Sequence, residues 1–132
     1  MAHTTVKTTK VFQSDAPYSQ ATATSDGRWV QISGQVAIDE KGANVAVGDV
    51  GAQAMQALEN MRLLVEAAGG QMSDVCRMVV YVMDRAHLPA VMQARKQYFK
   101  APYPANTAVI VSGLANADWL VEIEGTAFIS GK

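Results

Sequence analysis

The sequence predicts an α+β fold in which one mixed β-sheet carries two helices on a single face. One segment, 49–68, repeats apolar residues at helical spacing, and a second helix is predicted at 88–99. Short β-prone runs precede, separate and follow them, which gives the order β-β-β-α-β-α-β-β. The length of 132 residues suits one two-layer domain. Because no linker, charge block or repeat divides the chain, we expect residues 1–132 to share one core.

Three β-prone runs in the first third of the chain predict strands at 6–12, 19–24 and 29–33. Asp26-Gly27 lies between the second and the third run, and this dipeptide is a strong signal for a two-residue hairpin turn. We therefore expect the second and third strands to pair as an antiparallel hairpin.

The segment 49–68 has the apolar stripe of a helix that packs on one side. Asp49 is suited to cap its first turn, and Gly69-Gly70 is suited to end it. The residues of the stripe are Val50, Ala54, Ala57, Met61, Leu64 and Ala68.

A buried strand is expected at 75–83, followed by a helix at 88–99 with Pro89 in its first turn, where a missing N–H costs little. Strands at 105–111 and 120–128 complete the order. In the strand 75–83, alternation places Cys76, Met78, Val80 and Val82 on one face and Arg77, Val79 and Tyr81 on the other.

The face of the sheet away from the helices needs a cover. It carries Asn106, Ala108 and Ile110 if Thr107, Val109 and Val111 point to the helices, and Glu122 and Glu124 if Val121 and Ile123 do. Copies packed about an axis would bury this face, and a closed ring is the usual symmetric result. The composition agrees, since 17% of the residues are charged where roughly a quarter is usual.

Composition also limits the function. A formal net charge of −1 gives no basic field for phosphate backbones, so no nucleic-acid partner is expected. The lone Cys76 excludes an internal disulfide, and neither histidine has a spaced partner, so no metal and no other cofactor is expected. Because no signal peptide and no run of roughly 18 apolar residues is found, the expectation is a cytoplasmic protein without membrane contact.

Four segments of this chain resemble the reactive intermediate deaminase (RidA/YjgF) family over almost its whole length. They are Ala16-Pro-Tyr-Ser-Gln20, Ile32-Ser-Gly-Gln35, Tyr103-Pro-Ala-Asn-Thr-Ala-Val109 and Val121-Glu-Ile-Glu124. Each motif alone is common, so the resemblance lies in their order and spacing. It implies a fold of the bacillus chorismate mutase type and a homotrimer with small-molecule ligands in the clefts between subunits. It also implies hydrolysis of enamines and imines to carbonyl compounds and ammonia.

The resemblance also assigns site residues. As catalytic residues it implies Glu122, which would hold and polarise the attacking water as general base, and Tyr18, which would donate a hydrogen bond to the substrate. Other interpretations remain open. Glu122 is also compatible with a strand carboxylate paired with Arg77, Tyr18 with a ring at a subunit boundary, and Gly34 with a β-bulge. The implied substrate-binding residues are Ser33, Gly34, Gln35, Asn106, Thr107 and Ala108.

Asn106 stands where the family usually has arginine. A neutral amide offers neither the charge nor the fork that clamps a carboxylate. We therefore expect an altered substrate choice: an imine or enamine without a carboxylate, or one whose carboxylate contacts Arg77. The alternative is a non-catalytic trimer that binds a small metabolite. A ribonuclease or translation inhibitor ranks last, since the chain lacks a basic track and a catalytic histidine pair.

Overall fold

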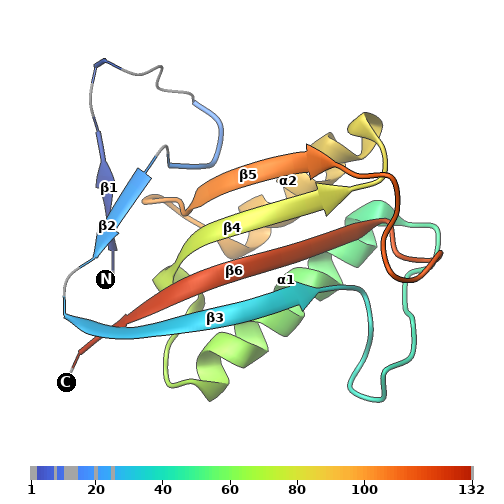
Figure 1. The fold of residues 1–132 in the computed structure, drawn as a ribbon, viewed down its shortest axis with the longest axis horizontal. Coiled ribbons are helices and arrows are strands. Elements are labelled where there is room, and N and C mark those ends of the chain that lie inside the picture. The colour runs from blue at the N-terminus through green and yellow to red at the C-terminus, as the bar shows by residue number, and fades with distance from the viewer. Residues whose placement is uncertain (1–2, 8, 11–14, 20, 25, 132) are drawn as a thin grey trace.

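The computed structural model describes residues 3–7, 9–10, 15–19, 21–24 and 26–131. Its helices and strands follow the predicted order (Figure 1). They are β1 (His3–Val6), β2 (Ala21–Thr24), β3 (Gly27–Gln35), α1 (Val50–Ala67), β4 (Val75–Val82), α2 (Leu88–Tyr98), β5 (Ala105–Ile110) and β6 (Val121–Ser130), with short 3-10 turns at Met72–Asp74 and Arg85–His87. None of the helices in this part of the chain is long and apolar enough to cross a membrane.

A four-stranded mixed sheet forms the centre of the fold, in the order β3-β6-β4-β5. Strands β4 and β5 run parallel, whereas β6 is antiparallel to both β3 and β4. Figure 1 shows α1 and α2 together behind this sheet, which confirms the α+β prediction with both helices on one face. Strands β1 and β2 form a separate antiparallel pair, and Ser19, just before β2, bonds through its N–H to the Pro104 carbonyl (3.0 Å) beside β5.

The hairpin expected at Asp26-Gly27 is wrong, because β2 pairs with β1 while β3 pairs with β6. Gly27 lies opposite Ser130, and a Cβ at this position would overlap the Ile129 carbonyl oxygen. The glycine therefore permits a close approach of two strands rather than a turn. The first strand also lies earlier than the expected 6–12, and positions 8, 11 and 12 lie outside the described residues.

Helix α1 begins and ends as predicted. The Asp49 carboxylate accepts a hydrogen bond from the Ala52 N–H (3.0 Å), and Gly69 follows the helix end with a φ of +93°. Leu64 was wrongly placed in the buried stripe, since it is 45% exposed. It lies about 60° around the helix from the centre of the true stripe, near its edge. The buried residues of α1 are Gln53, Ala54, Ala57, Leu58, Met61 and Val65.

The central strands β4 and β6 alternate as predicted over most of their length. Met78 and Val80 of β4 and Ile123 of β6 are buried in the core under the helices, which leaves Glu122 on the opposite face. Cys76 is the exception, because the pairing of β4 with β6 shifts between Val75 and Arg77. This bulge turns Cys76 away from the main core to pack with Phe128.

The expected orientation of β5 is reversed. The parallel register pairs Asn106 with Met78 and Ala108 with Val80, so both side chains face the helices. Thr107 instead lies on the uncovered face, where its hydroxyl accepts a hydrogen bond from Arg77 (3.0 Å). Small and apolar residues occur at both the odd and the even positions of this edge strand. The alternation of the sequence alone therefore does not reveal which side is buried.

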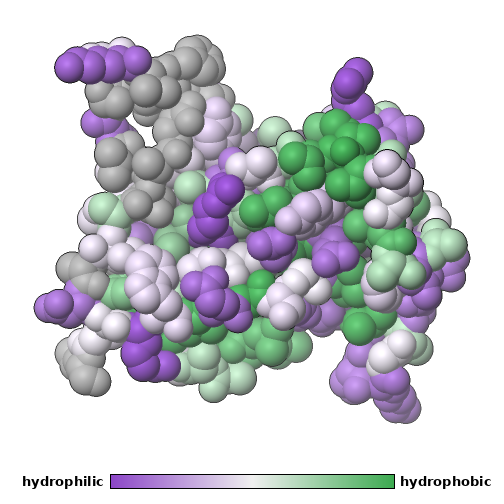
Figure 2. All heavy atoms as spheres, in the orientation of Figure 1, coloured by the Kyte–Doolittle hydropathy of each residue, from purple (hydrophilic) through white to green (hydrophobic). Residues whose placement is uncertain are grey.

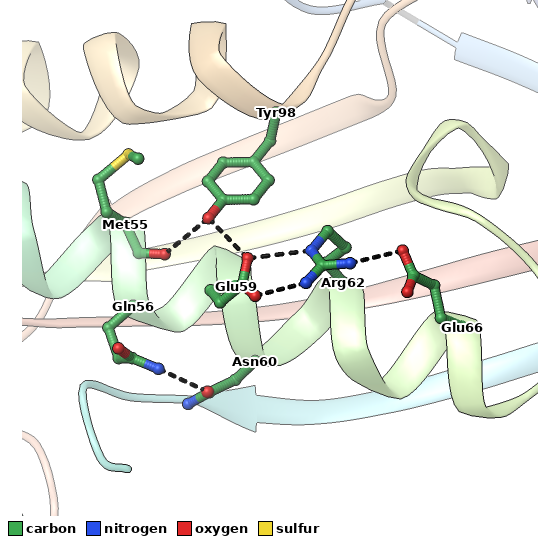
Figure 3. Close-up of polar contacts among 7 residues, drawn as sticks. All are labelled: Met55, Gln56, Glu59, Asn60, Arg62, Glu66 and Tyr98. Carbon is green, nitrogen blue, oxygen red and sulfur yellow. Dashed lines mark hydrogen bonds and ion pairs between the residues drawn. The ribbon is translucent and has the colours of Figure 1, made fainter.

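The two helices are tied together by a polar cluster on their outer surface (Figure 3). The Tyr98 hydroxyl of α2 donates to Glu59 of α1 at 3.0 Å. Arg62 donates to both oxygens of the same carboxylate, and a third bond joins it to Glu66 at 2.7 Å. The hydrogen bonds from Arg62 lower the pKa of Glu59. Burial and the Glu59 carboxylate raise the pKa of Tyr98 to about 12.

Tyr98→Phe is expected to lower the free energy of unfolding by about 1 kcal/mol at pH 7, since it removes this hydrogen bond. The pKa of Tyr98 is raised on folding, so its contribution is fully present below the phenol's ordinary value near 10. It is lost as the pH rises through about 12. Urea unfolding of both proteins at pH 7, 9 and 11 measures the difference, which should shrink only at pH 11. Tyr103→Phe is the control, and a difference independent of pH would contradict the expectation.

Candidate functional site

A pocket of about 180 Å³ opens between α2, the β4–β5 edge of the sheet and the segment before β2. Asn106 and Ala108 enter it together because they are two residues apart on β5 and share a face. Tyr18 reaches it from the segment before β2. The full lining is Ala16, Tyr18, Val80, Leu88, Val91, Met92, Arg95, Asn106 and Ala108. The wall is thus largely apolar, with three polar side chains.

Two polar groups in this wall have unsatisfied hydrogen-bonding capacity. The Oδ1 atom of Asn106 and the Nε atom of Arg95 are buried and have no hydrogen-bond partner among the described residues. Arg95 is only 6% exposed, and burial lowers the pKa of its guanidinium. Within the described part of the chain it forms no ion pair, because the salt bridges there belong to Arg62. Such groups normally have partners when buried.

A second set of predicted residues lies on the helix-free face of the sheet. The pairing of β3 with β6 shifts between Ile32 and Gln35, so Gly34 is part of a β-bulge. A Cβ at Gly34 would overlap the Glu122 carboxylate, which therefore lies directly over this glycine. Beside it, the Gln35 side chain donates to the Ser33 carbonyl at 2.9 Å. Gly34 can therefore both form the bulge and allow the close approach of Glu122, because it has no side chain.

The Glu122 carboxylate makes no hydrogen bond and no ion pair with another residue of the described ranges, Arg77 included. The polar side chains near it form hydrogen bonds with other residues instead. Tyr81 donates to Glu124 at 2.5 Å, a bond that, with burial, raises the pKa of the phenol. Arg77 donates to Thr107 and to the Met78 carbonyl. Glu122 is thus a carboxylate with free acceptor capacity on this face.

Figure 2 looks onto the helix-free face and shows hydrophilic and hydrophobic side chains intermixed across it. The two sets of predicted residues lie on opposite sides of the sheet. Tyr18, Asn106 and Ala108 are on the side of α2, whereas Glu122 and Thr107 are on the helix-free side. A single chain therefore does not bring the acid to the pocket. Among the described residues, no three His, Cys, Asp or Glu side chains gather as a metal site.

Arg95 was not identified from the sequence. It precedes Lys96 in a helix, and adjacent charged residues there usually indicate a solvated face. Its burial could have been predicted from its spacing, because Leu88, Val91 and Arg95 lie three and four residues apart and so share one side of a helix. A charged residue in register with the apolar stripe of a helix points to a buried charge.

The chain matches a known protein family over most of its length. Residues 8–129 match the family described as Endoribonuclease L-PSP. The chain is similar to a 2-iminobutanoate/2-iminopropanoate deaminase of Dermatophagoides farinae, with 34% identity over 113 residues and 86% of each protein covered. It is also similar to the 3-aminoacrylate deaminase RutC of Acinetobacter baylyi, with 36% identity over 114 residues, covering 86% of this chain and 88% of that protein. A solved structure of YyfB from Yersinia pestis, a Rid family protein of unknown function, superposes with a TM-score of 0.90 at 32% identity, covering 98% and 100% of the two chains.

Gly34→Ala is expected to displace the Glu122 carboxylate, since the new methyl group would occupy its position. The protein should still fold, because the end of a flexible side chain can move away. A crystal structure of the variant would show where Glu122 points, and thermal unfolding would report the cost. Gly113→Ala is the matched control, since a Cβ there meets nothing within 4 Å. An unmoved Glu122 in the Gly34 variant would contradict the description of this contact.

Proposed function

Because the chain belongs to the RidA/YjgF family, we propose that it is a hydrolase that converts small imines or enamines to carbonyl compounds and ammonia. The observation that carries the proposal is the Glu122 carboxylate, which lies over Gly34 with its acceptor capacity free. Relatives that are named imine and aminoacrylate deaminases support the reaction class. The pocket beside α2 supplies a largely apolar place for the substrate.

We further propose that the active site forms between neighbouring copies in a homotrimer. The acid and the pocket lie on opposite sides of one sheet, so a second chain must bring Glu122 to the pocket that contains Asn106. Closure of three copies into a ring buries the helix-free face and repeats this contact at every seam. The resemblance to a trimeric family supports the same arrangement.

In the proposed reaction a water molecule bound by Glu122 adds to the carbon of the C=N bond. Glu122 accepts one proton from the water as the C–O bond forms and transfers it to the nitrogen, which takes up the electron pair of the C=N bond. The resulting carbinolamine passes its hydroxyl proton to the nitrogen through Glu122, forms the C=O bond as the C–N bond breaks, and releases ammonia. An enamine first takes a proton on carbon to become the imine. Tyr18 positions the substrate by a hydrogen bond.

Asn106 bears on the binding of the substrate rather than on the proton transfers. Its amide provides no positive charge at the position where the resemblance leads one to expect arginine. Selection of the substrate therefore depends on the other groups of the pocket. Arg77 does not supply that charge within one chain, since it lies on the opposite side of the sheet, bonded to Thr107.

Glu122→Gln is expected to abolish hydrolysis, because the amide keeps the shape of the side chain and removes the base. The assay adds the protein to freshly generated imines, with and without a carboxylate, and follows ammonia release above the buffer rate. Glu40→Gln, an exposed carboxylate in the loop after β3, is the matched control and should retain full activity. Circular dichroism would show that both variants are folded.

Two outcomes, each combining the ammonia assay with a second measurement, would count against a hydrolase. Wild-type protein that gives no rate above buffer with any imine, yet binds the carbonyl products, is a metabolite-binding protein. Cleavage of an RNA substrate without any imine hydrolysis would assign the chain to the ribonuclease class instead. Retained activity in Glu122→Gln would leave the reaction class standing and reject Glu122 as its base.

A further inference from the structure

Arg95 is a buried cation for which the described part of the chain provides no counter-charge. Its side chain is 6% exposed, and neither a hydrogen bond nor an ion pair reaches its guanidinium from another described residue. Burial of an unpaired charge is unfavourable, so a protein retains one where a partner arrives from outside. The partner that such a group selects is an anion.

The position of Arg95 identifies that outside partner as a ligand. It lies in the wall of the pocket that also contains Tyr18 and Asn106. Its place in α2, seven residues after Leu88 and four after Val91, directs it to the same side of the helix as the apolar lining. A guanidinium presents a planar fork that matches the two oxygens of a carboxylate.

Asn106 completes the description of the ligand. Its Oδ1 atom is buried in the same wall and has no hydrogen-bond partner among the described residues, so it can accept a hydrogen bond from an N–H group. One ligand that carries both an anion and an N–H group would satisfy Arg95 and Asn106 together. The rest of the wall, including Val80, Val91 and Met92, suits a short apolar side chain.

The size of the pocket limits the class of ligand further. Its volume of about 180 Å³ lies below the 300–1,000 Å³ that is typical of sites for larger ligands. A small 2-imino or enamino acid has the required carboxylate, the N–H group and a short carbon chain.

We propose that Arg95 of α2 is the carboxylate-binding residue of the site, in place of a cation at position 106. Asn106 accepts the hydrogen bond of the substrate nitrogen and thereby orients its C=N carbon. The inference rests on the proposed function, since it assigns a further residue to the same site. It replaces Arg77, the cation that the sequence suggested for a carboxylate substrate, with Arg95 of α2.

Binding of stable ligands tests the inference without catalysis. Isothermal titration calorimetry compares 2-oxobutanoate, which carries a carboxylate, with 2-butanone, which lacks one. Wild-type protein is expected to bind 2-oxobutanoate about tenfold or more tightly than the ketone, as a charge-assisted contact implies. Equal affinities for the two ligands would overturn the proposal whatever the variants do.

Variants then locate the charge. Arg95→Gln should remove the preference for 2-oxobutanoate and leave 2-butanone binding unchanged. Lys96→Gln removes the same charge from the next, exposed position of α2 and should retain the preference. Undiminished binding of 2-oxobutanoate by Arg95→Gln would overturn the assignment. If that variant does not fold, Arg95→Lys keeps the charge but loses the fork, and unchanged binding of 2-oxobutanoate would count equally against it.

Two further measurements separate a ligand role from a structural one. The ligand-free Arg95→Gln protein should melt at the wild-type temperature or above, since no described residue of the same chain loses a bond; a large decrease would indicate a structural role instead. Glu122→Gln should bind 2-oxobutanoate normally while it fails to hydrolyse imines. Hydrolysis without any dependence on Arg95 would reject this inference alone, and Arg95-dependent binding without hydrolysis would reject the proposed function alone.

Discussion

The packing of both helices against one face of the sheet determines which residues of every strand can reach a ligand. Ile123 is buried under the helices, so its neighbour Glu122 must point to the opposite face. The same alternation turns Asn106 toward α2 and Thr107 away from it. Because neighbouring residues on a strand diverge in this way, segments that are contiguous in the sequence contribute to two separate surfaces of one chain. An active site that needs both surfaces therefore needs two copies.

The helical and central parts of this fold could be predicted because their local signals agree with the tertiary packing. Asp49 and Gly69 mark the ends of α1, and the alternation of β6 is fixed by apolar residues at every second position. Predictions failed where the local sequence is compatible with more than one structure. Gly27 resembles a turn residue but allows a close strand contact, and the edge strand β5 has no apolar pattern strong enough to reveal its buried side.

For the candidate site too, the sequence identified local motifs but not how the fold places them relative to one another. The motifs around Tyr18, Gly34, Asn106 and Glu122 were found in the sequence, but their separation onto two faces depends on strand register and on the bulge in β3. Arg95 was missed because its burial depends on the packing of α2 against the sheet. In the structure the cationic side chain that lines this pocket is Arg95 of α2, while β5 contributes the neutral Asn106.

The most direct test of the account is to mix two inactive variants, since the central claim is that each site takes its pocket from one copy and its acid from the next. Glu122→Gln and Asn106→Leu are each expected to be inactive as pure trimers, and light scattering should give three times the 14.1 kDa chain mass for both. After subunit exchange in an equal mixture, about a quarter of the seams in a random ring would combine an intact pocket with an intact acid, so about a quarter of the wild-type rate should return. A mixture that remains inactive although hybrid trimers have formed would contradict the account.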